Sequence, residues 1–363
     1  MKIIADQDIP FIKHYFDNAY LIEGRNLQQN QIKDADMLLV RSITKVNEAL
    51  LKGTNIKFVA SPTTGTDHFD IAYLNKAGIL WANAHGCNAI AVEEYVICAI
   101  AALQKQGYLT GSHLRAGVIG VGNIGSRVAE KLKLLGFDVI QCDPLRAEKE
   151  TDFPHVPLEE FSDLDFISLH TPLTKSGNYP TYHMIQKTFL DKQKKNTILM
   201  NTGRGAVIDF NDLKLYGEYL IWCLDVWENE PFIDIEVLNR AFIATPHIAG
   251  YTVQSKYRGI KMIYDVAVQQ GFIENKKVNP LILPAQNMVF NTPVDWQDIV
   301  LKIYDPLVTT NVMKQAIFEN DQASTFDNLR KNFADNRHEF AYVQAENIHW
   351  IDKIDKSIWE VLV

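Results

Sequence analysis

Short runs of apolar residues recur along the first two thirds of the chain, and polar or helix-patterned segments separate them. The runs lie at 2–5, 37–40, 56–60, 114–119, 137–142, 166–170, 197–201, 221–225 and 242–245. A short and almost wholly apolar run is typical of a strand buried on both faces of a parallel sheet. Strands that alternate with helices predict α/β domains with right-handed crossovers.

Two longer segments, 88–106 and 252–271, carry the spacing of helices. The second would return the chain to its first domain, and the composition changes after residue 280. We therefore expect three parts, which comprise residues 1–95 with 251–280, residues 96–250, and residues 281–363. The last part carries no motif from which a reaction could be inferred, and a packing or oligomerisation role is the simplest reading of it.

A glycine-rich turn follows the run at 114–119 and opens a helical pattern. It reads Gly120-Val-Gly122-Asn123-Ile124-Gly125. The first glycine permits a tight turn, the second admits a pyrophosphate close to the backbone, and the third lets the next helix pack on the strand. The N-terminus of that helix would then face the phosphates. The turn predicts a dinucleotide-binding Rossmann domain.

An acidic residue, Asp143, ends the strand that follows this helix, about 20 residues after the glycines. A carboxylate at that place accepts hydrogen bonds from the ribose hydroxyls and repels a 2′-phosphate, so NAD is favoured over NADP. The alternative is that Asp143 only forms the turn before Pro144. Arg146 lies close by, and an arginine at such a place can instead accommodate the 2′-phosphate of NADP.

The overall composition excludes several classes of protein. Hydrophobic residues make up 47% of the 363 positions and charged residues 22%, which is ordinary for a globular protein, and the formal net charge is −8. A net negative chain lacks the excess of positive charge that is typical of proteins binding nucleic acid or an anionic membrane. An anionic substrate would have to be held by a few local cations.

The cysteines and the apolar segments favour a cytoplasmic protein. Four widely spaced cysteines form no CxxC pair, so neither a disulfide framework nor a zinc ribbon is expected. Asp6 and Asp8 interrupt the first apolar residues, which argues against a signal peptide. The longest apolar stretch, 89–103, contains Glu93 and Glu94, so no membrane span is expected.

Three candidate catalytic residues follow successive predicted strands: Arg204, Glu230 and His247. A doubly wound sheet builds its site at the carboxyl ends of its strands. The fork of an arginine matches a carboxylate, and a histidine beside a carboxylate can take the proton of a hydroxyl. Together they describe the oxidation of a 2-hydroxy acid, with a nicotinamide as the redox partner.

Several alternatives remain open at this point. Each of the three residues taken alone is more often a surface ion pair or a capping group, and the spacing does not decide between Glu228 and Glu230 as the acid. His170 also ends a predicted strand. Three further histidines lie in turn-like sequence, His68, His85 and His183. No clustered metal ligands and no G-x-S-x-G motif are present, so neither a metal site nor a hydrolase is expected.

Six ordered motifs resemble the D-isomer-specific 2-hydroxyacid dehydrogenases. They are GVGNIG at 120–125, Asp143, HTPL at 170–173, NTGRGAVID at 201–209, LDVWENEP at 224–231 and TPHIAGYT at 245–252. The resemblance implies that Arg204 binds the substrate carboxylate, that His247 is the acid/base, and that Glu230 rather than Glu228 is its partner. It also implies further residues that line NAD, namely Thr171, Thr202, Gly203, Arg204, Asp225 and Gly250.

A closer resemblance connects the chain to one member of that family, which acts on a phosphorylated 2-hydroxy acid. It is carried by segments 40–51, 65–68, 85–96, 172–184 and 326–332. It implies that Ser42, Thr63 and Tyr251 contact the substrate. It also implies a flavodoxin-like substrate domain, a Rossmann NAD domain, and a small C-terminal α+β domain that joins two copies into a homodimer.

The identity of the substrate leaves room for other readings. Arg41, Lys45 and Arg258 are candidate partners of a substrate phosphate, and solvated surface charge is an equal alternative for them. Another D-2-hydroxy acid, such as D-3-phosphoglycerate, is an alternative substrate. A non-catalytic NAD-sensing protein of the same fold is the alternative from a different class.

Overall fold

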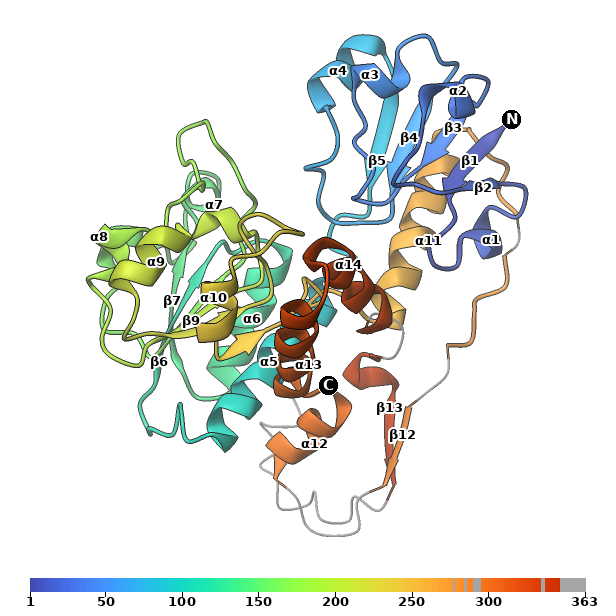
Figure 1. Ribbon diagram of the computed structural model, residues 1–363. Coiled ribbons are helices and arrows are strands. Elements are labelled where there is room, and N and C mark those ends of the chain that lie inside the picture. The colour runs from blue at the N-terminus through green and yellow to red at the C-terminus, as the bar shows by residue number, and fades with distance from the viewer. Residues whose placement is uncertain (277, 284–285, 290–294, 334–336, 347–363) are drawn as a thin grey trace. The chain divides into compact units, whose positions relative to one another are not determined.

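The computed structural model describes residues 1–276, 278–283, 286–289, 295–333 and 337–346 (Figure 1). The chain divides into two compact units, which are described separately. Unit 1 comprises Met1–Asn88 and Val253–Leu283, and unit 2 comprises Ala89–Thr252 and Pro284–Val363. The three-part division expected from the sequence stays a prediction. Part of its C-terminal domain, residues 347–363, lies outside the described residues.

Unit 1 is built on a parallel sheet of five strands in the order β2-β1-β3-β4-β5. Its strands are β1 (Ile3–Asp6), β2 (Tyr20–Ile22), β3 (Met37–Leu39), β4 (Phe58–Ser61) and β5 (Leu80–Asn83). Its helices are α1 (Ile12–Tyr15), α2 (Gln29–Ile32), α3 (Glu48–Leu51), α4 (Ile71–Ala77) and α11 (Val253–Gln269). This strand order is that of flavodoxin-like folds, which confirms the predicted fold class for this unit.

Alternate side chains of these strands enter two different cores. Ile3 and Ala5 of β1 pack in one cluster, to which α11 contributes Ile260 and Ile263, while Ile4 packs in the cluster on the opposite face. Successive strand side chains point to opposite faces, so a sheet covered on both sides needs apolar residues at every position. This explains the unbroken apolar runs in the sequence.

Unit 2 contains a parallel sheet of six strands in the order β11-β10-β9-β8-β6-β7. The strands are β6 (Arg115–Ile119), β7 (Asp138–Cys142), β8 (Phe166–Leu169), β9 (Ile198–Asn201), β10 (Ile221–Leu224) and β11 (Ile243–Ala244). The chain leaves β6 toward β7 and then crosses to β8 on the other side of β6. Ligands of doubly wound sheets bind at the carboxyl ends of the strands at such a switch point.

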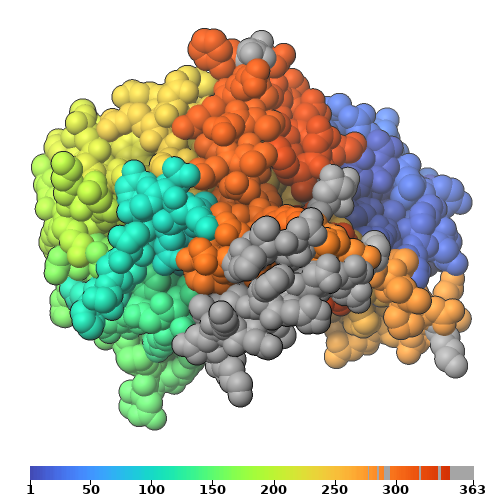
Figure 2. All heavy atoms as spheres, turned by 90° about the horizontal axis from the view of Figure 1, so that it is seen from below, coloured from blue at the N-terminus to red at the C-terminus, as the bar shows by residue number. Residues whose placement is uncertain are grey.

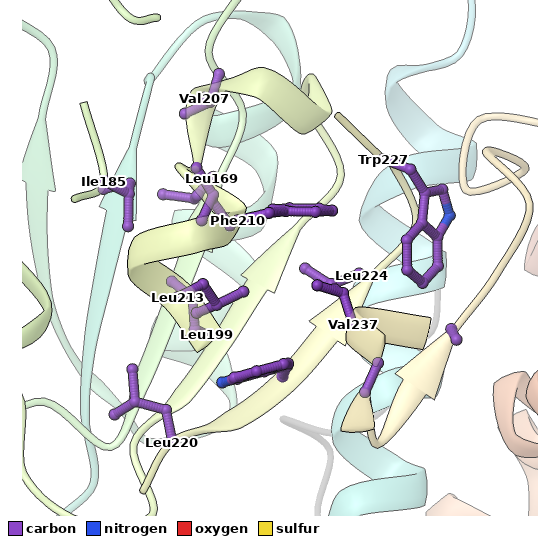
Figure 3. Packing of buried hydrophobic residues seen from close by; sticks show 14 of the residues in the cluster. Leu169, Ile185, Leu199, Val207, Phe210, Leu213, Leu220, Leu224, Trp227 and Val237 are labelled. Carbon is purple, nitrogen blue, oxygen red and sulfur yellow. The ribbon is translucent and has the colours of Figure 1, made fainter. Parts of the chain in front are cut away.

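Helices and short turns cover both faces of this sheet. They are α5 (Ala89–Lys105), α6 (Asn123–Leu134), α7 (Pro144–Ala147), η1 (Leu158–Glu160), α8 (Lys187–Leu190), η2 (Gly205–Val207), α9 (Phe210–Tyr216) and α10 (Ile235–Arg240). On one face, Leu199 and Leu224 of the sheet pack against Phe210 and Leu213 of α9 (Figure 3). On the other, Val118 packs with residues of α5 and α6. This doubly wound unit confirms the expected Rossmann domain.

The C-terminal part of unit 2 contains helices and a pair of strands, as the α+β prediction requires. Its elements are β12 (Gln286–Val289), α12 (Trp296–Ile303), α13 (Pro306–Glu319), α14 (Gln322–Phe333), η3 (Phe340–Tyr342) and β13 (Val343–Glu346). On the face shown in Figure 2, orange C-terminal residues lie beside the teal end of α5. There Lys105 lies 2.7 Å from Asp298 of α12. Thr310 of α13 accepts a hydrogen bond from the backbone N–H of Ala244 in edge strand β11 at 2.9 Å.

Four strands were not expected from the sequence: β2, β5, β12 and β13. Tyr20 and Leu21 of edge strand β2 are exposed, as is Leu80 of edge strand β5. Edge strands can face solvent and need no continuous apolar run. Among the residues that the structure describes, none of the helices has the length and apolar character needed to cross a membrane.

Candidate active site

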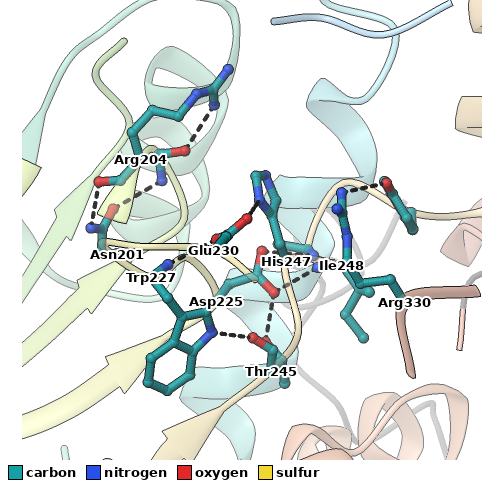
Figure 4. Close-up of polar contacts among 12 residues, drawn as sticks. Asn201, Arg204, Asp225, Trp227, Glu230, Thr245, His247, Ile248 and Arg330 are labelled. Atoms are coloured by element: carbon teal, nitrogen blue, oxygen red, sulfur yellow. Dashed lines mark hydrogen bonds and ion pairs between the residues drawn. The ribbon is translucent and has the colours of Figure 1, made fainter. Parts of the chain in front are cut away.

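The candidate catalytic residues all lie in unit 2, in loops that follow the carboxyl ends of neighbouring strands. Arg204 follows β9, Glu230 follows β10, and His247 follows β11. These three strands are adjacent and parallel, so their carboxyl ends meet at one edge of the sheet. Figure 4 shows the side chains of this edge together.

His247 and Glu230 are in direct contact. The Nδ1 atom of His247 lies 2.7 Å from Oε2 of Glu230, and the backbone N–H of Trp227 donates to Oε1 of Glu230 at 2.9 Å. Burial alone would raise the pKa of Glu230. The charge and hydrogen bond of His247, together with the charge of Arg330 and the Trp227 N–H, outweigh burial and lower this pKa. The Glu230 carboxylate therefore occupies Nδ1 of His247, and Nε2 is the ring nitrogen that can exchange a proton with a ligand.

The turn that presents His247 is organised by Asp225, at the end of β10. The buried Asp225 carboxylate accepts hydrogen bonds from the Thr245 hydroxyl at 2.6 Å and from the backbone N–H groups of Ile248 and Ala249 at 2.8 and 3.0 Å. Burial raises the pKa of Asp225, despite the opposing influence of His247 and these donors. His247 itself adopts a φ of 56°, a left-handed conformation that is uncommon outside glycine. Asp225, predicted to line NAD, thus shapes the histidine turn in this structure.

Arg204 is brought beside the glutamate loop by a close backbone approach. A Cβ atom added to Gly205 would lie 1.9 Å from the carbonyl carbon of Trp227, so only glycine fits between the two loops. Asn201 fixes the same turn, because its Nδ2 donates to the Arg204 carbonyl at 3.0 Å and its Oδ1 accepts from the Gly203 N–H at 3.0 Å. The partly buried Arg204 guanidinium donates to the Gly203 carbonyl at 2.9 Å.

The glycine turn has the shape that a dinucleotide requires. Gly120 has a φ of +84°, and a Cβ on Gly125 would lie 2.0 Å from the Gly120 carbonyl oxygen. Gly122 and Asn123 are exposed at the start of α6, and a Cβ on Gly122 would meet nothing within 4 Å. Two positions thus demand glycine for packing, and the third leaves the approach to the helix N-terminus open.

A buried polar atom beside this turn also fits a cofactor. The hydroxyl oxygen of Thr171, which follows β8, is buried without a hydrogen-bond partner among the residues described. A Cβ on Gly120 would lie 2.7 Å from the Thr171 side chain, so the hydroxyl belongs to the switch point between β6 and β8. An orphaned buried donor calls for an explanation, and a bound ligand supplies one. Ile124 is partly buried in the first turn of α6.

Asp143 ends β7 as expected and makes two backbone contacts. Its carboxylate accepts from the N–H of Val121 in the glycine turn at 2.9 Å and from the N–H of Arg146 at 3.0 Å. The second bond caps α7, so Asp143 does form the turn before Pro144. The first bond ties the same carboxylate to the glycine turn, which keeps the cofactor role open.

The competing residues fall into other environments. Burial lowers the pKa of His170 to about 3, so its ring is neutral, and it lies 2.9 Å from Ser168 and 3.0 Å from Thr202. His183 lies between two carboxylates, 2.6 Å from Glu228 and 3.1 Å from Asp209. The structure therefore places Glu230, and not Glu228, on His247.

Comparisons with known proteins agree with this site. Residues 101–249 match the model of the D-isomer specific 2-hydroxyacid dehydrogenase, NAD binding domain. The chain is 41% identical over 350 residues to an erythronate-4-phosphate dehydrogenase of Coxiella burnetii, covering 95% of this chain and 94% of that protein. A second erythronate-4-phosphate dehydrogenase, from Marinobacter nauticus, is 38% identical over 92% of this chain and 91% of its own length.

The chain belongs to the erythronate-4-phosphate dehydrogenase family. A solved structure of NAD+-bound 3-phosphoglycerate dehydrogenase from Entamoeba histolytica is similar in fold, with a TM-score of 0.63 and 26% identity, covering 78% of this chain and 99% of that one. Family membership confirms the sequence resemblance and the class of the enzyme, an NAD-dependent dehydrogenase. The roles of individual residues in this chain stay predictions.

Of the three residues predicted to contact the substrate, two lie in unit 1 and one lies in unit 2. Ser42 is exposed after β3, and the Thr63 hydroxyl lies 2.8 Å from that of Ser61 after β4. Tyr251 is partly buried after the histidine turn of unit 2, where Gly250 precedes it. Each therefore follows the carboxyl end of a strand, as a ligand contact in this fold requires.

The three candidate phosphate cations differ in their surroundings. Arg41 lies 2.8 Å from Asp6 and 2.8 Å from Asp8, so its charge is already matched by two carboxylates. Nε of Arg258 donates to the backbone carbonyl of Cys87 at 3.0 Å. Lys45 is exposed.

Sequence reasoning missed one cation of the site, Arg330. It lies on α14, and its Nη2 donates to the Tyr251 hydroxyl at 2.8 Å across a separation of 79 positions. No motif near Arg330 indicates this contact. The only available signal was the resemblance of segment 326–332 to the family.

Proposed function

We propose that this chain oxidises 4-phospho-D-erythronate at its 2-hydroxyl to 2-oxo-3-hydroxy-4-phosphobutanoate, with NAD as the oxidant, in pyridoxal phosphate biosynthesis. The observation that carries the proposal is the 2.7 Å contact between His247 and Glu230 in a chain of the erythronate-4-phosphate dehydrogenase family. Other D-2-hydroxyacid dehydrogenases would use the same chemistry, so the substrate rests on the closer relatives.

The proton of the 2-hydroxyl is assigned to His247. Nδ1 of His247 donates to the Glu230 carboxylate, which leaves Nε2 unprotonated and able to accept that proton. Glu230 then stabilises the positive ring, since a carboxylate beside an imidazolium favours the charged form. The hydrogen on C2 leaves as hydride, with both electrons of the C2–H bond. The oxygen that loses its proton to His247 becomes the 2-oxo group.

NAD, when bound, supplies the acceptor for the hydride. Residues of the glycine turn, with Asp143 and Thr171, would hold it, together with Thr202, Gly203, Asp225 and Gly250. The unpartnered Thr171 hydroxyl and the open approach at Gly122 support this assignment. Backbone N–H groups at the start of α6 would face the pyrophosphate.

The substrate carboxylate is assigned to Arg204. A guanidinium can bind a carboxylate through two parallel hydrogen bonds and so fix the orientation of C2. Arg204 is held next to the glutamate loop by the close approach of Gly205 to Trp227, which supports this role. Ser42, Thr63 and Tyr251 are further proposed substrate contacts.

The test is a comparison of kcat/KM for NADH formation with four acids: 4-phospho-D-erythronate, D-erythronate, D-3-phosphoglycerate and D-lactate. The proposal predicts the highest value for 4-phospho-D-erythronate. A higher value for D-3-phosphoglycerate would assign a different substrate. No NADH from any of the four acids would point to a binding protein instead.

We also propose a cytoplasmic homodimer that forms through the C-terminal part of the chain. The three apolar side chains Val308, Val312 and Phe318 of α13 are exposed, with 80% of Phe318 accessible. Exposed apolar groups on one helix favour association with a second copy. Light scattering after size exclusion tests this, and Phe318→Lys with Val312→Lys should give monomers. All four cysteines lie among the described residues, where they are buried and no disulfide joins them, which suits a reducing compartment.

A further inference from the structure

Arg330 lies in unit 2 beside the proposed catalytic pair, although it comes from the C-terminal helix α14 (Figure 4). Its guanidinium donates one hydrogen bond, from Nη2 to the Tyr251 hydroxyl at 2.8 Å. Its positive charge is also one of the influences that lower the pKa of Glu230. Arg330 thus acts on a proposed substrate contact and on the partner of His247.

The donors of this guanidinium are mostly unused. Among the residues that the structure describes, Arg330 forms no ion pair within 4 Å, and its Nε is buried without any hydrogen-bond partner. A guanidinium carries five N–H donors and stays charged at every physiological pH. A partly buried cation that lacks an anion is unfavourable, because burial removes water and nothing replaces it.

The carboxylates of Glu230 and Asp327 are near enough to raise the pKa of Arg330, but neither forms an ion pair with its guanidinium. Its guanidinium carbon lies 5.6 Å from the ring centre of Tyr251 and 6.0 Å from that of Phe326, one turn earlier on α14. Aromatic rings attract a cation weakly, and they leave the planar fork free to meet an oxyanion. Among the described residues, none places an oxyanion in an ion pair with this guanidinium, so a bound anion would complete its contacts.

We propose that Arg330 binds the phosphate of the substrate and so determines the preference for a phosphorylated acid. This inference rests on the proposed function, in which the substrate has two anionic ends. Arg204 receives the carboxylate, which leaves the phosphate for a second cation. Arg41 is the weaker candidate, since Asp6 and Asp8 already match its charge.

The test compares wild type with Arg330→Gln on two substrates, 4-phospho-D-erythronate and D-erythronate. The phosphorylated substrate should lose about 10- to 100-fold in kcat/KM, mainly through KM, as expected for a lost hydrogen bond to a charged group. The loss for D-erythronate should be clearly smaller, because without a phosphate only the contacts of Arg330 with Tyr251 and Glu230 are affected. Equal losses on both substrates would show that Arg330 acts only through Tyr251 or Glu230 and would overturn the proposal, as would no loss on either.

Two variants make the result specific to this arginine. Arg240→Gln removes another arginine of unit 2, an exposed one whose guanidinium carbon lies 4.5 Å from the ring centre of Trp222. This change should leave the ratio of the two kcat/KM values unaltered. Arg330→Lys keeps the charge and loses the planar fork, so it should recover part of the preference. It also serves as the test variant if Arg330→Gln fails to fold.

Binding of inorganic phosphate separates this inference from the proposed function. Calorimetric titration of the NAD-loaded enzyme with phosphate requires no turnover. Wild type should bind phosphate at least about tenfold more tightly than Arg330→Gln. If wild type makes no NADH from 4-phospho-D-erythronate but the phosphate difference holds, the proposed substrate is wrong and the anion site stands. If turnover is normal and phosphate binds both forms equally, the inference about Arg330 is wrong.

Discussion

Nδ1 of His247 lies 2.7 Å from Oε2 of Glu230, although 17 positions of the chain separate the two residues. The other carboxylate oxygen of Glu230 is held by the N–H of Trp227. The carboxylate is therefore fixed at both of its oxygens, and the imidazole ring has one defined hydrogen-bond partner. A proton acceptor held this way is positioned before the substrate arrives.

Replacement of the glutamate should reduce turnover strongly. In Glu230→Gln the neutral amide cannot stabilise the positive ring that forms when His247 takes a proton. We expect kcat to fall about 100-fold or more, while KM changes little. The measurement is steady-state NADH formation from 4-phospho-D-erythronate at saturating NAD.

Glu228→Gln is the matched control for that experiment. Glu228 lies in the same loop, and its Oε1 is 2.6 Å from Nε2 of His183 rather than from His247. The amide can still hydrogen-bond to His183, so kcat should stay within about threefold of wild type. This change is much smaller than the loss expected for Glu230→Gln. Similar losses in both variants would contradict the assignment of the acid partner.

Much of this arrangement could be predicted from the sequence. The buried strands β6, β8, β9 and β10 appear as apolar runs because helices cover both faces of their sheet. Residues that follow parallel strands must share an edge, so the meeting of Arg204, Glu230 and His247 followed from strand order. The glycine turn was predictable because two of its glycines are sterically required.

Two features could not be predicted from the residues alone. The choice between Glu228 and Glu230 depends on the turn after β10, which directs one carboxylate to His183 and the other to His247. Arg330 lies on a helix without a motif, and its approach to Tyr251 depends on how α14 packs in unit 2. Contacts between distant segments leave no periodic pattern in the sequence.

A methyl group at Gly205 should disturb the site. The added Cβ of Gly205→Ala would lie 1.9 Å from the Trp227 carbonyl carbon, so one of the two loops must move. We expect a loss of stability of about 1–3 kcal/mol and a higher KM for the acid, since Arg204 is adjacent. Thermal unfolding and kinetics measure the two effects. In Gly111→Ala the nearest atom is a Leu114 methyl at 3.3 Å, and stability should hardly change; equal effects would refute the steric account.

Asp143 should determine the choice of cofactor. Its carboxylate ends β7 and contacts the Val121 N–H of the glycine turn. In Asp143→Ser the repulsion of a 2′-phosphate is lost, so the ratio of kcat/KM for NAD to that for NADP should fall by about tenfold or more. Asp138→Ser, at the other end of the same strand, is the control. An unchanged ratio in Asp143→Ser would remove Asp143 from the cofactor site.

Glu94 should make stability depend on pH. Burial raises the pKa of this α5 carboxyl from 4.5 to about 8, and the nearby charge of Arg337 and the Phe340 N–H only partly offset the rise. Between these two values the folded state keeps a proton that the unfolded state releases. Stability contributed by this group is therefore lost as pH rises through that window.

Glu94→Gln should remove this loss. The amide oxygen can still accept the 2.8 Å hydrogen bond from the Phe340 N–H, but it carries no charge at any pH. The difference in Tm, variant minus wild type, should be larger above pH 8 than near pH 4.5. Glu130→Gln changes an exposed carboxylate of α6 and should leave the Tm profile of wild type unaltered. A Glu94→Gln profile parallel to wild type would disprove the assignment.

The most direct test of the catalytic assignment is NADH formation from 4-phospho-D-erythronate by His247→Asn, measured beside the affinity of the same variant for NAD. Asparagine keeps a polar side chain but cannot accept the proton of the 2-hydroxyl. The account predicts that kcat falls by about 100-fold or more while the Kd of NAD stays within about threefold of wild type. Retention of most of the wild-type kcat would contradict it.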